Sequence, residues 1–187
     1  MSIYINDNLA QFELDEALPL LSVQRREQCL KFKYELGRKQ CAAAYLLLCQ
    51  GLREEYGITE PPIFAYGEHG KPMIVDHPDI HFNMSHCREA VICMLSNKPI
   101  GIDVETIHRY SESLARYTMS DEEMEQILQS DNPALVFTRL WTMKEAVLKL
   151  SGHGLTDNLK PVLSQFSGKL QTIAHPDLRY VYSLADE

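Results

Sequence analysis

The sequence predicts an α+β protein, and three features of the chain support this expectation. Two long stretches, residues 38–51 and 133–150, are apolar around most of the helix circumference, which is typical of buried helices. Between them, residues 80–105 contain short runs of apolar side chains separated by turn residues, the pattern of antiparallel strands. Consecutive strands with helices before and after them indicate that helices and strands are segregated along the chain.

The composition is that of an ordinary globular protein. The chain has 187 residues, of which 45% are hydrophobic and 24% charged, so it is long enough for one domain or two small ones. Its net charge of −8 argues against a general binder of nucleic acid or of anionic membranes. The N-terminus lacks a basic region followed by an apolar core, and no apolar run could cross a bilayer. We therefore expect no signal peptide and no membrane span.

The cysteines indicate a reducing compartment. There are five of them, and no two form a C-x-x-C pair, so the sequence suggests neither a disulfide framework nor a zinc site. We expect reduced, partly buried thiols in a cytoplasmic protein.

The first elements of the chain are a short strand and two helices. Ser2–Ile5 is expected as the strand, and Ser22 can cap a helix over residues 22–29. Residues 38–51 should form the core helix of the first half, with Gly51 and Gly57 bracketing its end. The early helix begins a basic cluster that, taken alone, is more typical of a solvated helix face; its members are Arg25, Arg26, Lys31 and Lys33.

Residues 61–74 indicate loop and strand. Within them Lys71 lies in a turn-rich piece that Pro72 helps to fix. A lysine in a rigid loop can bind a phosphate or can be plain surface, and the sequence favours neither reading.

A strand running into a turn is expected over residues 80–87. Asn83, Ser85 and His86 place amide, hydroxyl and imidazole groups close together, a mixture that suits a phosphate or a ribose. Residues 90–95 form an apolar strand, and Asn97–Pro99 is a turn that divides the chain into residues 1–97 and 98–187. We expect the strands of residues 80–105 to form an antiparallel meander.

The strand after this turn carries two carboxylates. Asp103 and Glu105 are two residues apart, so they share one face of an extended strand, while Ile102 and Val104 share the other. Adjacent carboxylates repel unless a positive group lies between them. Two interpretations follow: a divalent metal such as Mg²⁺, or an edge strand with a solvated acidic face.

The helix over residues 133–150 carries charges on a largely apolar surface. Glu145 and Lys149 are four residues apart and share a face, which would ordinarily be a helical ion pair worth about 0.3–0.5 kcal/mol. Charges on a buried helix need partners, and a metal facing Glu145 with a phosphate facing Lys149 would supply them. Lys144 should project toward the apolar side, either snorkelling or contacting phosphate.

The flanking segments complete the expected elements. A helix with a gap covers residues 114–128, with a cap and an acidic first turn beginning at Ser120. Glycines after residue 150 should end the long helix. Residues 164–184 indicate strands and offer no motif.

In combination, these pieces resemble one family. Gly70–Pro72, Phe82–His86, Gly101–Glu105 and Trp141–Lys149 resemble, in order, motifs of the 4′-phosphopantetheinyl transferases, specifically the surfactin-synthetase-type branch. Gly152–Leu155 matches the glycine turn that follows the family's long helix. The resemblance covers roughly residues 22 to 157, and the two acidic motifs are highly specific when found together.

The resemblance implies a reaction. Such enzymes move 4′-phosphopantetheine from coenzyme A to a serine of an acyl or peptidyl carrier protein and leave adenosine 3′,5′-bisphosphate. They use Mg²⁺, with Mn²⁺ as the alternative, to neutralise the departing phosphate. The carrier could serve fatty-acid, polyketide or peptide synthesis. A non-catalytic module that binds coenzyme A or a nucleotide on the same fold is the rival reading, and a plain structural protein is the third.

The resemblance also implies roles for individual residues. Asp103, Glu105 and Glu145 would surround the metal, and Glu145 would act as general base toward the incoming serine. Lys149 would be the second catalytic residue and would hold a pyrophosphate oxygen or the leaving phosphate. The contacts to coenzyme A would come from Arg25, Lys71, Asn83, Ser85, His86 and Lys149.

The early helix departs from the family pattern. Two basic residues are usual there, and Arg25 fits one of them, but the second falls at about Gln28. Arg26 or Lys31 would serve only after a shift of register.

The implied fold has two similar halves. Each is a small antiparallel sheet packed on a long helix, with the coenzyme in the cleft between the halves. Members of this branch act as single chains, so we expect a monomer.

Overall fold

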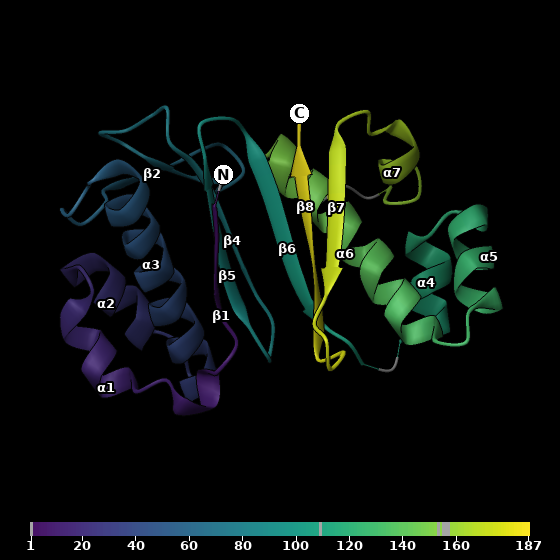
Figure 1. Cartoon of the computed structure of the whole chain (residues 1–187), viewed down its shortest axis with the longest axis horizontal. Coiled ribbons are helices and arrows are strands. Elements are labelled where there is room, and N and C mark those ends of the chain that lie inside the picture. The colour runs from purple at the N-terminus through teal and green to yellow at the C-terminus, as the bar shows by residue number, and fades with distance from the viewer. Residues whose placement is uncertain (1, 109, 153, 155–157) are drawn as a thin grey trace.

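The computed structural model describes residues 2–108, 110–152, 154 and 158–187. Its helices and small antiparallel sheets confirm the α+β prediction (Figure 1). Within this part of the chain no helix combines the length and apolarity needed to span a membrane.

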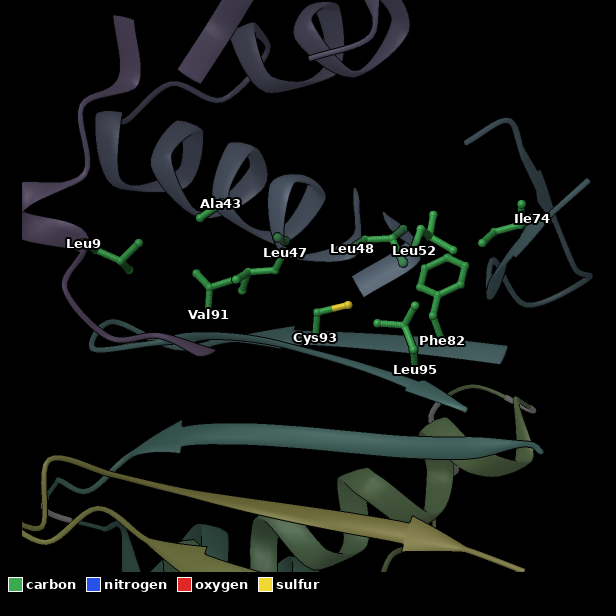
Figure 2. Packing of buried hydrophobic residues seen from close by; sticks show 11 residues of the cluster. Leu9, Ala43, Leu47, Leu48, Leu52, Ile74, Phe82, Val91, Cys93 and Leu95 are labelled. Atoms are coloured by element: carbon green, nitrogen blue, oxygen red, sulfur yellow. The ribbon is translucent and has the colours of Figure 1, made fainter. Parts of the chain in front are cut away.

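The first sheet packs on one long helix. Its strand order is β1 (Ser2–Asn6), β5 (Val91–Ser96) and β4 (His81–His86), all antiparallel. The helix α3 (Glu35–Tyr56) covers one face of this sheet, and apolar side chains from both fill the space between them (Figure 2). The labelled residues of this core include Leu47, Leu48 and Leu52 of the helix, and Val91, Cys93 and Leu95 of the central strand.

Smaller elements surround this first layer. They are η1 (Leu9–Gln11), α1 (Leu14–Ala17), η2 (Leu18–Leu20), α2 (Val23–Leu30) and the hairpin of β2 (Phe64–Tyr66) with β3 (Pro72–Ile74). The Ser22 side chain caps α2 by accepting from the backbone N–H of Arg25, as predicted.

The two glycines of the core helix have different roles. Gly57 ends α3 in the left-handed conformation with φ of 67°, as predicted. Gly51 does not lie at a frayed end, because α3 continues past it. A Cβ at Gly51 would meet Leu95 and, at 2.8 Å, the ring of Tyr4, so its glycine lets the helix approach the sheet closely.

The second sheet repeats this arrangement with a second long helix. Its order is β6 (Ile100–Thr106), β8 (Tyr180–Asp186) and β7 (Lys169–Ala174), and α6 (Pro133–Ser151) packs on β6 and β8. Gly152 ends α6 with φ of 69°, as predicted. The remaining helices are α4 (Glu112–Thr118), α5 (Asp121–Gln129) and α7 (Val162–Gln165), and α5 begins with a complete capping box at Ser120 and Glu123.

The two sheets pack face to face. Ile92 and Met94 of β5 join Ile102, Val104 and Leu184 of the second sheet in one buried cluster. The order of layers is therefore α3, first sheet, second sheet, α6, with β4 and β6 adjacent where the two sheets meet (Figure 1).

The predicted three-stranded meander is wrong in its third strand. β4 and β5 pair as expected, but the backbone of β6 pairs with β8 near the end of the chain. Side chains of β4 bridge the junction instead: Asn83 Oδ1 accepts from the N–H of Ile102 at 3.1 Å, and Ser85 Oγ from that of Val104 at 3.3 Å. The local sequence could not predict that β6 pairs with β8. The pairing depends on the burial of apolar side chains from both strands against the first sheet.

Substituting Gly101 by Ala should destabilise the protein strongly. A Cβ at this position would overlap the carbonyl oxygen of Ala146 and approach the backbone nitrogen of Leu150 at 2.5 Å. Backbone atoms cannot rotate away, so α6 must shift, and we expect a loss of at least about 1–3 kcal/mol in the free energy of unfolding. Denaturant unfolding measures this, with Gly67→Ala as control because its Cβ would meet only the Lys71 carbonyl oxygen at 3.7 Å. Equal stability of both variants would contradict the close approach.

Candidate functional site

The acidic face of β6 is buried under α6. Asp103 is only 3% exposed, and Glu105 is partly buried, while Ile102 and Val104 face the first sheet. The period-two reading of this strand is therefore confirmed. β6 is an edge strand of its sheet, but its carboxylates are not a solvated face, because a helix covers them.

Asp103 lies in a network with one lysine and one serine. The Lys149 ammonium donates to Asp103 Oδ1 at 2.7 Å and to Ser85 Oγ at 2.9 Å, and Ser85 Oγ donates to the same carboxylate oxygen at 2.9 Å. Ser85 also accepts from the backbone N–H of Val104, so its one donor and two acceptor positions are all used. The network joins β4, β6 and α6 at one point.

Two further carboxylates lie close to Asp103. Burial raises the pKa of Glu105 to about 7, with the Asp103 carboxylate as the next contribution. Burial also raises the pKa of Glu145, and Asp103 again adds to the effect. In both cases Lys149 acts in the opposite direction. The site therefore brings three carboxyl groups together around one lysine.

The oxygen atoms of this site suit a hard divalent cation. Asp103 Oδ2 is buried and has no hydrogen-bond partner, which is costly unless something else occupies that position. Among the described residues, no three His, Cys, Asp or Glu side chains form a ready metal cage. Mg²⁺ commonly takes only one or two carboxylates and fills its other positions with water and substrate phosphates. The oxygen atoms present thus fit a cation that completes its coordination with water and with the phosphates of a substrate.

A pocket of about 310 Å³ opens beside this network. Glu145 and Lys149 of α6 form one side, and the turn between β2 and β3 forms another. Its lining is His69, Gly70, Lys71, Pro72, Asn83, Met84, Glu145, Leu148, Lys149, Gly152 and Gly154. Four predicted site residues, from both sides of residue 97, therefore border one cavity. Met84, Leu148 and Gly154 also line it; they lie within the motifs that resemble the family, but the sequence predicted no role for them in the site.

Lys71 makes contacts that the sequence did not predict. Its ammonium donates to the carbonyl oxygens of Lys149 at 2.7 Å and Leu150 at 3.0 Å, and a third carbonyl, that of Ile100, lies at 3.5 Å. Burial lowers the pKa of this ammonium. A role in phosphate binding stays a prediction, and in the structure the group is directed at the end of α6.

The other residues predicted to contact coenzyme A do not all lie at the pocket. Asn83 borders the pocket, but its Oδ1 is used by the backbone of β6. Desolvation and the nearby Lys149 ammonium lower the pKa of His86. The imidazole therefore lies close enough to the site to interact with the charge of Lys149. The Arg25 guanidinium lies over the rings of Tyr45 and Phe64 at 5.3 and 5.1 Å and is not among the pocket's lining residues.

Lys144 has a structural partner. It is 1% exposed, and its ammonium contacts Glu123 Oε2 at 2.8 Å and the carbonyl oxygens of Leu159 and Lys160 at 2.8 and 3.2 Å. Neither snorkelling nor phosphate contact is therefore correct for this residue. Nothing in the local sequence links residues 123 and 144; the pair arises because α5 packs on α6. In the predicted glycine turn, His153 and Leu155 lie outside the described residues.

Comparison with known proteins identifies relatives over most of the chain. A sequence model of the 4′-phosphopantetheinyl transferase superfamily matches residues 99–180. The 4′-phosphopantetheinyl transferase Sfp of Bacillus subtilis (strain 168) is 33% identical over 157 residues, which cover 82% of this chain and 70% of that protein. The 4′-phosphopantetheinyl transferase psf-1 of Bacillus pumilus is 28% identical over 178 residues, covering 94% of this chain and 75% of its own.

Proposed function

The chain belongs to the 4′-phosphopantetheinyl transferase superfamily, and on this premise we propose that it transfers 4′-phosphopantetheine from coenzyme A to a serine of a carrier protein. Adenosine 3′,5′-bisphosphate would be the second product. The observation that carries this proposal is the meeting of Asp103, Glu145 and Lys149 beside one pocket. Residues 2–97 and 98–187 would each supply one side of the coenzyme cleft.

Glu145 is our proposed general base. Its carboxylate borders the pocket, and its raised pKa makes it a better proton acceptor than an exposed glutamate. It would take the proton from the carrier's serine hydroxyl as that oxygen attacks the phosphorus next to the pantetheine. The bond to the second phosphate of coenzyme A breaks in the same displacement, and the bisphosphate leaves.

Lys149 is our proposed stabiliser of the charge on the leaving phosphate. Its side chain is 29% exposed, and its ammonium is already oriented by Ser85 and Asp103, so a phosphate oxygen in the pocket would meet a positioned cation. Asp103, Glu105 and Glu145 would hold Mg²⁺ or Mn²⁺. The bound ion would supply charge neutralisation at the diphosphate.

Other residues would surround coenzyme A. We propose that His86 and Ser85 face its phosphates, that Asn83 and Lys71 border it, and that Arg25 contributes from α2. The five cysteines are free thiols, which supports our expectation of a cytoplasmic protein. We also propose a monomer, since both sides of the pocket come from one chain.

Mass spectrometry of a carrier protein tests the activity. After incubation with the enzyme, coenzyme A and Mg²⁺, an apo carrier should gain about 340 Da, as expected for one covalently attached group. A carrier with Ala in place of its modified serine is the matched control and should gain nothing. No gain across fatty-acid, polyketide and peptide carriers, with coenzyme A still bound, would instead favour a non-catalytic coenzyme-binding module.

A further inference from the structure

We propose that Lys71 is a positioning residue: it fixes the C-terminal turn of α6 and thereby holds Lys149 in place beside Asp103. The proposal rests on the function proposed above, because it assigns Lys71 a task in the same site. It starts from the hydrogen bonds of Lys71 to the carbonyl oxygens of Lys149 and Leu150, at 2.7 and 3.0 Å.

The end of α6 needs external donors. The last carbonyl groups of a helix have no partner within the helix. The oxygen of Leu148 accepts from the N–H of Gly152 at 3.1 Å and from Ser151 Oγ at 2.9 Å. The next two oxygens, those of Lys149 and Leu150, accept from Lys71, which comes from a distant part of the chain. A cation at this end of the helix also interacts favourably with the negative end of the helix dipole.

The turn that carries Lys71 is itself well defined. The N–H of Gly67 donates to the Lys71 carbonyl oxygen at 3.0 Å, and Gly70, with φ of 79°, donates to the Gly67 oxygen at 2.9 Å. This turn packs on the residues that follow α6. A Cβ at Gly152 would lie 3.2 Å from Lys71 Cδ, and one at Gly154 would lie 3.6 Å from His69 Cβ. The β2–β3 turn therefore covers the end of α6 along one side of the pocket.

Lys149 is consequently held at two points. Its ammonium is bound by Asp103 and Ser85, and its backbone carbonyl by Lys71. Glu145 lies one turn earlier on the same helix and borders the same pocket. Loosening the last turn of α6 would displace the cation that faces the leaving phosphate, although Lys71 itself need not touch the substrate.

This task competes with phosphate binding by Lys71. An ammonium has three N–H donors, and three carbonyl oxygens lie within 3.5 Å of this one. To bind a phosphate, Lys71 would have to give up part of its hold on α6. The two roles therefore predict different kinetic results.

Lys71→Met tests the proposal, because methionine has a similar shape but no donor. We expect amides at the end of α6 to exchange with deuterium roughly 2- to 30-fold faster. In the carrier assay kcat should fall roughly 10- to 100-fold, as for a misplaced catalytic group, while KM for coenzyme A changes little. Lys98→Met, at an exposed lysine between β5 and β6, is the control and should alter neither quantity.

The other outcomes are equally informative. A higher KM for coenzyme A with unchanged kcat and unchanged exchange would overturn the proposal and assign Lys71 to phosphate binding. If Lys71→Met does not fold, Lys71→Arg, which keeps N–H donors, should retain slow exchange at α6, and fast exchange there would overturn the proposal. If the unmodified enzyme transfers nothing, the proposed function fails, while the exchange comparison still decides whether Lys71 holds the helix.

Discussion

Glu145→Gln should reduce transfer by roughly 10²- to 10⁴-fold, the usual contribution of a general base. The amide keeps the size of the side chain but cannot accept the serine proton, and it removes one of the negative charges near Asp103. The affinity for coenzyme A should fall only a few-fold, because the proposed phosphate contacts lie on other residues. Single-turnover transfer to an apo carrier measures the first quantity, and calorimetric titration of coenzyme A with and without Mg²⁺ measures the second.

The control for this substitution is Glu60→Gln. Glu60 is an exposed glutamate in the loop before β2, so the same chemical change there should leave transfer and coenzyme affinity unchanged. If Glu145→Gln weakened coenzyme binding as much as it slowed transfer, Glu145 would be a binding residue and not the base. If transfer persisted at the normal rate, the proton acceptor would have to be sought elsewhere in the pocket.

The parts of the site that the sequence predicted are those with short-range periodicity. Asp103 and Glu105 share a face because strand side chains alternate, and Glu145 and Lys149 share one because helix positions four apart coincide. Ser22 and Ser120 cap helices through contacts with residues three positions away. Each of these features depends on local geometry, which the neighbouring sequence determines.

The features that the sequence did not predict depend on distant contacts. β6 pairs with β8, a strand from a region without motifs, because both must cover the same apolar layer. Lys71 was expected to face a phosphate or solvent, and its ammonium instead reaches a helix end 78 residues away in the chain. Electrostatic and packing partners of this kind become visible only when the layers are assembled.

Lys144→Met should cost about 3–5 kcal/mol in the free energy of unfolding, the usual effect of removing one partner from a buried ion pair. Lys144 and Glu123 have side chains that are 1% and 9% exposed and lie 2.8 Å apart. Without the ammonium, the Glu123 carboxylate would stay buried, and it could not turn outward without breaking its capping bond to the N–H of Ser120. The carbonyl oxygens of Leu159 and Lys160 would also lose a donor.

Denaturant unfolding of Lys144→Met beside Arg116→Met decides this prediction. Arg116 pairs with Glu112 at 2.6 Å on the surface, with both side chains more than half exposed, so its loss should cost at most about 1 kcal/mol. Equal costs would show that burial does not set the value of the Lys144 pair. A small loss of stability with a large loss of transfer would move Lys144 into the site. The lysines at 144 and 149 lie on one helix, and the expected contrast is that removing Lys144 mainly lowers the stability of the fold, whereas removing Lys149 mainly slows the reaction.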